Sequence, residues 1–105
     1  MTSKVPTPLL DGIVRRLAPV EVWLFGSHAR GEARADSDFD LFVVMDDDAG
    51  QDRFSNRAKA EARAHFDGCA DLVLARRSSF NRRRRLVGTL DEIVAGEGRR
   101  IYVRA

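Results

Sequence analysis

The chain has 105 residues, a formal net charge of +2 at pH 7, and 44% hydrophobic and 32% charged residues. These values favour a single globular domain covering residues 1–105, because a chain of this length has no room for a second core. No apolar run approaches the roughly 18 residues that a membrane-spanning helix needs. The one cysteine cannot form an internal disulfide, so we expect a cytoplasmic location and no membrane partner.

The charge is distributed unevenly along the chain. From Arg76 onward, nine arginines stand against three acidic residues. This asymmetry indicates that the C-terminal third meets an anion, which is a nucleotide, a nucleic acid or an acidic partner. A solvated helix surface is the alternative, because the run from Arg82 to Arg85 covers a full helical turn and points in several directions.

Hydrophobic spacing predicts helices and strands in alternation. Apolar residues between Pro8 and Pro19 recur at helical spacing, and each of the two clearest strands is a short run of strand-forming residues. Acidic residues and a glycine in 46–50 predict a loop. The predicted elements are a helix between Pro8 and Pro19, strand 20–25, short helix 27–34, strand 40–45, helix 52–66, strand 69–75, helix 81–95 and a short strand or extended tail at 101–103.

Two of these helices have a predicted buried face. In 52–66 the inner face is Phe54, Ala58, Ala62 and Phe66, and in 81–95 it is Leu86, Leu90, Ile93 and Val94. The order of elements predicts an α/β sandwich in which helices pack on a small sheet. Periodicity alone leaves open whether that sheet is parallel or mixed.

The centre of the chain carries a candidate metal site. Asp38 and Asp40 stand at the head of a strand, and side chains two residues apart project from the same face. Two close carboxylates repel each other and need a counter-charge, and oxygen ligands favour Mg²⁺ or Mn²⁺. Asp71 interrupts the apolar strand 69–75, where a buried lone carboxylate is costly, so it is the third candidate ligand. The alternative for Asp71 is a hydrogen-bonded carboxylate at a strand end.

The residues just before these carboxylates predict a phosphate site. Gly26 and Ser27 lie between a strand and a helix, where free backbone N–H groups bind phosphate and a glycine permits close approach. Arg30, one turn later, can reach the same phosphates. A phosphate cradle beside a metal site is suited to in-line attack on the α-phosphorus of a nucleoside triphosphate. His28, beside the cradle, is interpreted as an exposed helix residue.

The stretch GSHARGEARADSDFDLFVV resembles the signature of the minimal nucleotidyltransferases, small members of the DNA polymerase beta-type nucleotidyltransferase superfamily. The segments CADLVLA and EIVAGEGRRIYV are similar to the third-carboxylate strand and the close of these domains. The resemblance implies an α+β two-layer sandwich with a small mixed sheet, the nucleotidyltransferase fold. It implies that Asp38, Asp40 and Asp71 hold two Mg²⁺ ions, that Asp71 helps to deprotonate the acceptor, and that Gly26 and Ser27 bind the triphosphate of ATP.

The resemblance also implies a biological role. Many such domains are antitoxins of a HEPN-domain ribonuclease toxin and transfer AMP from ATP to a tyrosine of that toxin. One alternative is an antitoxin that acts by direct binding without catalysis. Another alternative is transfer to a small molecule. The expected lack of an acceptor domain in this short chain argues against it. We expect a protein acceptor rather than a nucleic acid, and homo- or hetero-oligomers are both compatible with the sequence.

Overall fold

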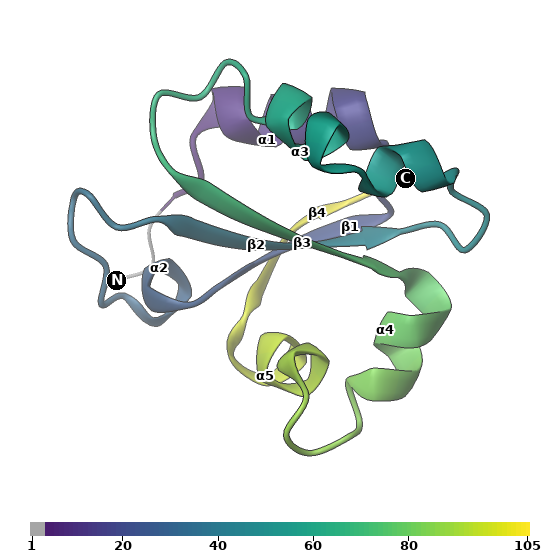
Figure 1. The fold of residues 1–105 in the computed structure, drawn as a ribbon. Helices are drawn as coiled ribbons and strands as arrows, with labels where there is room; N and C mark the ends of the chain where they lie inside the picture. The colour runs from purple at the N-terminus through teal and green to yellow at the C-terminus, as the bar shows by residue number, and fades with distance from the viewer. Residues whose placement is uncertain (1–3) are drawn as a thin grey trace.

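The computed structural model of the chain describes residues 4–105, which form a four-stranded mixed sheet with helices on both faces (Figure 1). The strand order is β3-β2-β1-β4; β1 is antiparallel to β2 and β4, and β2 is parallel to β3. The predicted fold class is therefore confirmed. The elements are α1 (Thr7–Leu17), β1 (Glu21–Phe25), α2 (Ser27–Arg30), β2 (Phe39–Met45), the 3₁₀ turn η1 (Gln51–Phe54), α3 (Asn56–Ala62), β3 (Ala70–Arg76), α4 (Arg77–Arg83), α5 (Leu90–Glu97) and β4 (Arg99–Val103).

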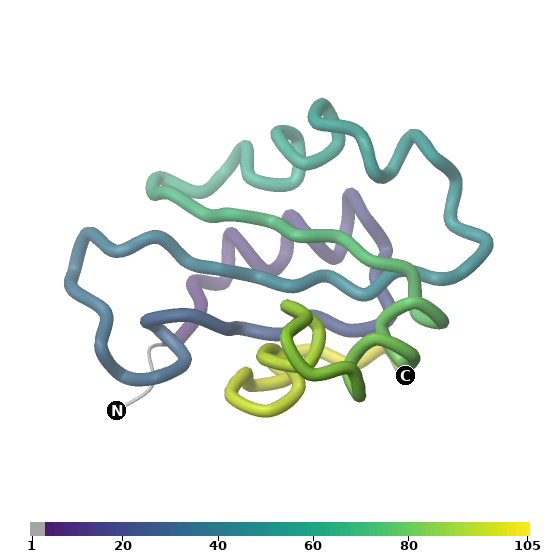
Figure 2. Tube along the Cα trace, turned by 60° about the horizontal axis from the view of Figure 1, so that its bottom comes forward, coloured from purple at the N-terminus to yellow at the C-terminus, as the bar shows by residue number. Residues whose placement is uncertain are grey.

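Alternate residues of the central strands face two separate cores. On β2, Leu41 and Val43 belong to the core under α1 and α3, whereas Phe42 and Val44 belong to the core under α4 and α5. Because both faces are covered, β2 is apolar along most of its length, as the sequence predicts for a central strand. Helices α4 and α5 cover the face of the sheet opposite to α1 and α3, and the two-layer description does not include this additional layer (Figures 1 and 2).

Helices α1 and α3 lie close together because small residues stand between them. A Cβ atom on Gly12 would collide with the carbonyl oxygen of Ala62, so only glycine permits this approach. Ala58 and Ala62 are buried as predicted. The single helix predicted for 52–66 is wrong in extent, because Ser55 is extended and its hydroxyl accepts the Ala58 N–H at 3.0 Å, starting α3 afresh.

The predicted helix 81–95 is also wrong, because the chain turns between α4 and α5. Gly88 has φ +92°, and the Thr89 hydroxyl accepts the Glu92 N–H at 3.1 Å and so begins a new helix. Of the four side chains expected on the inner face, only Val94 is buried; the other three are exposed. Across residues 4–105, every helix is too short or too polar to traverse a lipid bilayer.

Candidate active site

The site is built at the start of two parallel strands. Asp40 on β2 lies directly opposite Asp71 on β3, and neighbouring strands are about 4.8 Å apart. Strand alternation places both on the face that carries Phe42 and Val73 farther along, whose rings and methyl groups pack under α4 and α5. Two residues from Asp40, Asp38 precedes the strand. The topology thus brings together three carboxylates that are up to 33 residues apart in sequence.

Asp40 is the most perturbed carboxyl of the three. Burial raises its pKa first, and the negative charges of Asp71 and Asp38 raise it further. His28 and Arg30 act in the opposite direction through their positive charge. Asp71 and Asp38 therefore act on Asp40 through their negative charge.

The sequence reasoning about Asp71 needs one correction. Asp71 was expected to be buried within its strand, but its side chain is exposed because β3 is an edge strand of the sheet. Asp38 is exposed as well, and Asp40 is half-buried. The carboxylates are therefore open to a ligand that arrives from solvent.

The turn between β1 and α2 packs directly against the Asp40 carboxylate. Gly26 adopts φ 75° and ψ −155°, a region that is essentially closed to other residues. A Cβ atom at this position would lie 3.1 Å from Asp40 Cγ and would collide with its carboxylate oxygen. Gly26 is therefore required both by backbone conformation and by the closeness of Asp40.

Helix α2 presents free donors next to the cluster. The N–H groups of Ala29 and Arg30 bond to the Gly26 carbonyl, whereas, within residues 4–105, those of Ser27 and His28 donate to no backbone acceptor. The helix is shorter than predicted because Gly31, with φ 75°, ends it after Arg30. Two free N–H groups beside a glycine are the kind of donors that the predicted phosphate cradle requires, and phosphate binding by this turn stays a prediction.

Arg30 lies near the site but already has partners. Its Nε donates to Glu32 at 2.7 Å, and a guanidinium nitrogen lies 3.9 Å from Glu97 at the end of α5. The hydrogen bond to Glu32 raises the pKa of Arg30, and the charges of Glu97 and Asp40 add to this effect. Within residues 4–105, Nε is the atom of this guanidinium that makes a hydrogen bond, so the two Nη groups remain as donors for an anion.

His28 is a site residue whose position the sequence interpretation missed. It is 5% exposed, so the interpretation as an exposed helix residue is wrong. Its ring stacks on Phe39 with centroids 3.9 Å apart, and Nε2 donates to the Ser37 carbonyl at 2.9 Å. His28 thus joins the glycine turn to the segment that leads into Asp38. The available signal was that a one-turn helix on a sheet end must turn one side chain inward, and His28 is its only ring.

The three carboxylates fit a hard divalent cation in their chemistry. Aspartate carboxylates supply the oxygen ligands that Mg²⁺ takes. In residues 4–105, however, no three histidine, cysteine, aspartate or glutamate side chains converge closely enough to hold a metal ion. The magnesium ligands therefore stay a prediction.

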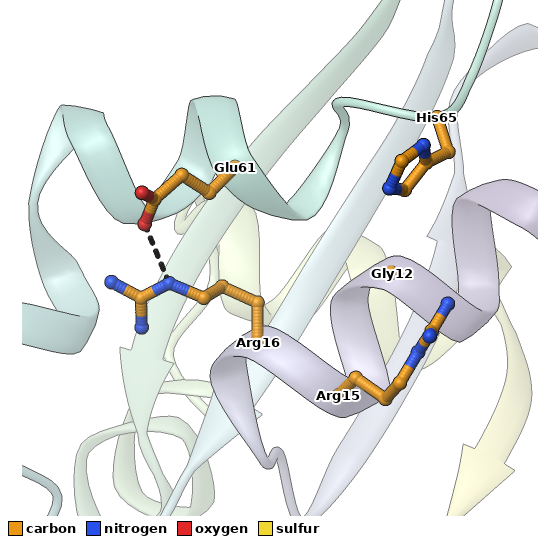
Figure 3. A pocket seen from close by; sticks show the side chains of 5 residues that line it. All are labelled: Gly12, Arg15, Arg16, Glu61 and His65. Atoms are coloured by element: carbon orange, nitrogen blue, oxygen red, sulfur yellow. Dashed lines mark hydrogen bonds and ion pairs between the residues drawn. The ribbon is translucent and has the colours of Figure 1, made fainter.

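A shallow cleft of about 250 Å³ lies elsewhere, between α1 and α3. Its lining is Gly12, Arg15, Arg16, Glu61 and His65, and Figure 3 shows Arg16 reaching across to Glu61, with a Nε to Oε1 distance of 2.7 Å. The cleft contains none of the predicted site residues. Because its central arginine is already neutralised by Glu61, it is not the candidate active site.

Carboxylates on adjoining strands, beside a glycine turn with free N–H groups, are features of phosphoryl-transfer enzymes. The comparison with protein families identifies which one. A model of the nucleotidyltransferase domain matches residues 9–96, and the chain belongs to this family. The membership that the sequence motif predicted is confirmed.

Two solved structures share the fold. One is a crystal structure of a toxin-antitoxin with AMP-PNP, with a TM-score of 0.61 at 20% identity, covering 94% of this chain and 75% of that one. The other is a candidate nucleotidyltransferase from Sulfolobus solfataricus, with a TM-score of 0.50 at 17% identity, covering 95% of this chain and 91% of that one. No curated protein matches this chain in sequence.

Proposed function

We propose that this chain is a Mg²⁺-dependent nucleotidyltransferase that transfers AMP from ATP to a tyrosine hydroxyl of a partner protein. The observation that carries the proposal is the register pair Asp40–Asp71, with Asp38 alongside and Gly26 in contact with Asp40. The family supports nucleotidyl transfer. The toxin-antitoxin with AMP-PNP supports an adenine nucleotide and a toxin as partner, which we take to be a HEPN ribonuclease.

Each residue has a defined task in this reaction. The N–H groups of Ser27 and His28 and the guanidinium of Arg30 bind and orient the triphosphate. Asp38, Asp40 and Asp71 would hold magnesium, which would supply positive charge to the phosphates and the leaving group. The acceptor oxygen bonds to the α-phosphorus, the bond to the β,γ-phosphates breaks, and pyrophosphate leaves. Asp71, exposed at the sheet edge, receives the hydroxyl proton.

Transfer of labelled AMP tests the proposal. The wild-type chain with Mg²⁺ and α-labelled ATP should label its partner, and Asp38→Ala combined with Asp40→Ala should abolish labelling. Asp11→Ala combined with Asp48→Ala is the matched control, because both carboxylates are exposed, Asp11 lies on α1, and Asp48 follows the end of β2 opposite to Asp38 and Asp40. Equal labelling by the two double variants would overturn the assignment of these residues.

A growth-rescue experiment separates this function from an antitoxin that works by contact. If catalysis neutralises the toxin, cells that express the toxin with the Asp38 and Asp40 double variant should stop growing. Growth at the wild-type rate would instead show that binding is sufficient.

A further inference from the structure

Exposed apolar side chains gather on the turn between α4 and α5. Five large hydrophobic residues are exposed in residues 4–105, and four of them lie within positions 86–93. Their exposed fractions are 49% for Leu86, 90% for Val87, 37% for Leu90 and 44% for Ile93. Scattered exposed apolar residues are ordinary, but a cluster with a polar rim marks a contact surface. We call these four residues, with Arg82 and Arg85, the α4–α5 surface.

The backbone that carries this surface is firmly held. The Thr89 hydroxyl lies 2.9 Å from the carbonyl oxygens of both Arg83 and Leu86, to either of which its single hydrogen can be donated, and it accepts the Glu92 N–H. The Gly88 N–H donates to the Glu92 carboxylate at 3.2 Å, which closes the turn from the other side. A preorganised turn loses little conformational freedom on binding, so its exposed side chains are suited to a docking role.

The apolar side chains of α5 divide between the protein and the solvent. Val94 is fully buried against the sheet, whereas Ile93 and, in the first turn of the helix, Leu90 are exposed. Figure 1 shows the connection from α4 to α5 projecting away from the sheet, which leaves room for a neighbour. Together with Leu86 and Val87, the two residues form a stripe that no described element covers.

The arginines beside the stripe divide in the same way. Arg83 pairs with the buried Asp91 at 3.3 Å, and Arg84 lies over the rings of Trp23 and Phe80. Within residues 4–105, Arg82 and Arg85 form no ion pair. Positions 76–90 contain no acidic residue, so these two guanidinium groups add positive charge to the edge of the stripe.

We infer that the α4–α5 surface binds an amphipathic helix of a partner protein, with aliphatic residues on its inner face and glutamate or aspartate along its edge. The four aliphatic side chains match the inner face of such a helix, and the two free arginines match its acidic edge. An RNA partner is disfavoured, because the surface carries no exposed aromatic ring on which bases could stack. The inference goes beyond the proposed function and does not depend on nucleotidyl transfer.

The test is binding of a stapled helical peptide to the full chain, measured by fluorescence anisotropy. The probe carries leucine at positions i, i+3, i+4 and i+7 and glutamate on the flanks; a second probe has lysine in place of each glutamate. Saturable binding of the acidic probe is expected, with at least about tenfold weaker binding of the lysine probe. Val87→Asp combined with Ile93→Asp should weaken the acidic probe by at least about tenfold.

Charge reversal makes the test specific. Arg82→Glu combined with Arg85→Glu should reverse the preference, so that the lysine probe binds more tightly than the acidic one. Two matched controls should bind like the wild type: Val103→Asp, which alters the fifth exposed apolar residue, and Arg15→Glu with Arg99→Glu, which reverses two cations elsewhere. Circular dichroism before each titration confirms that the variants are folded.

Three results would overturn the inference. The first is that the acidic probe shows no saturable binding to the wild type, or binds the Val87→Asp, Ile93→Asp variant as tightly as the wild type. The second is a dimer of the wild-type chain in sedimentation that Val87→Asp dissociates, since the surface would then bind a second copy. The third is tight binding of a single-stranded RNA that Arg82→Glu with Arg85→Glu abolishes while the acidic probe still binds.

Discussion

Replacement of Gly26 by alanine tests whether the glycine turn and the carboxylate cluster are one unit. The turn requires φ 75° with ψ −155°, and a side chain forced into this region costs about 1–3 kcal/mol. A domain of this size loses about 4–8 °C in Tm for each kcal/mol, so Gly26→Ala should melt about 4–24 °C lower. Because domains are stable by about 5–15 kcal/mol, the variant should remain folded at 15 °C.

The effect of this variant on nucleotide binding should exceed its effect on stability. The new Cβ would collide with the Asp40 carboxylate, which must leave its present position beside Gly26. Calorimetric titration with ATP and Mg²⁺ at 15 °C should therefore show affinity reduced at least about tenfold, the loss expected when a site residue is displaced.

Gly88→Ala is the matched control for Gly26→Ala. Gly88 also has a positive φ, of 92°, but a Cβ there meets nothing within 4 Å. This variant should lower Tm through backbone strain and leave ATP affinity unchanged. Equal ATP affinity for the Gly26 and Gly88 variants would refute the link between the turn and Asp40.

Three further predictions concern individual side chains. Asp40→Asn should raise Tm at pH 7 by about 2–4 °C, because it removes a carboxylate whose pKa is raised by burial and by neighbouring acids. The gain in Tm should fade below about pH 4, where the wild-type carboxyl is protonated in both the folded and the unfolded state. A lower Tm of the variant at pH 7 would contradict this prediction. His28→Ala should lower the free energy of unfolding by about 2 kcal/mol in urea titrations, because the stack on Phe39 and the hydrogen bond to the Ser37 carbonyl are lost. The control variant His65→Ala, at an exposed histidine, should change the free energy of unfolding by less than about 0.5 kcal/mol. Equal losses for the two variants would refute the role of His28 in joining the glycine turn to the segment before Asp38. Arg104→Ala should lower Tm at pH 7, because the hydrogen bond to Arg104 lowers the pKa of Asp46. The deficit in Tm should shrink as the pH falls below the ordinary aspartate pKa of about 4, because the stabilisation is lost as Asp46 becomes protonated, and a deficit that does not change with pH would rule out this ion pair as the cause.

Local sequence was sufficient to predict the strands and to nominate the residues of the candidate site. The runs that became β1, β2 and β3 are rich in strand-forming residues; β1 ends at Gly26 and β2 at Asp46, so their backbone preference and their boundaries agree. The spacing of Gly26, Ser27, Asp38 and Asp40 pointed to a phosphate and cation site because each residue has few other chemical uses in that arrangement.

Periodicity failed where a local cap competed with it. Leu86, Leu90, Ile93 and Val94 have helical spacing, but Thr89 and Gly88 divide the segment, and three of the four side chains end exposed. An apolar stripe looks the same in sequence whether it faces the core of its own chain or is left for a partner. The pattern therefore identified the residues of the α4–α5 surface and assigned them to the wrong environment.

Only the tertiary structure decided which carboxylates meet. Asp40 and Asp71 are brought opposite each other by the parallel pairing of β2 and β3, a register that depends on non-local contacts between strands. The edge position of β3 leaves Asp71 exposed, and the packing of His28 on Phe39 fixes the glycine turn against the strand. The sequence by itself determined the chemical groups of the site, while strand order and packing decided their distances and their access to solvent.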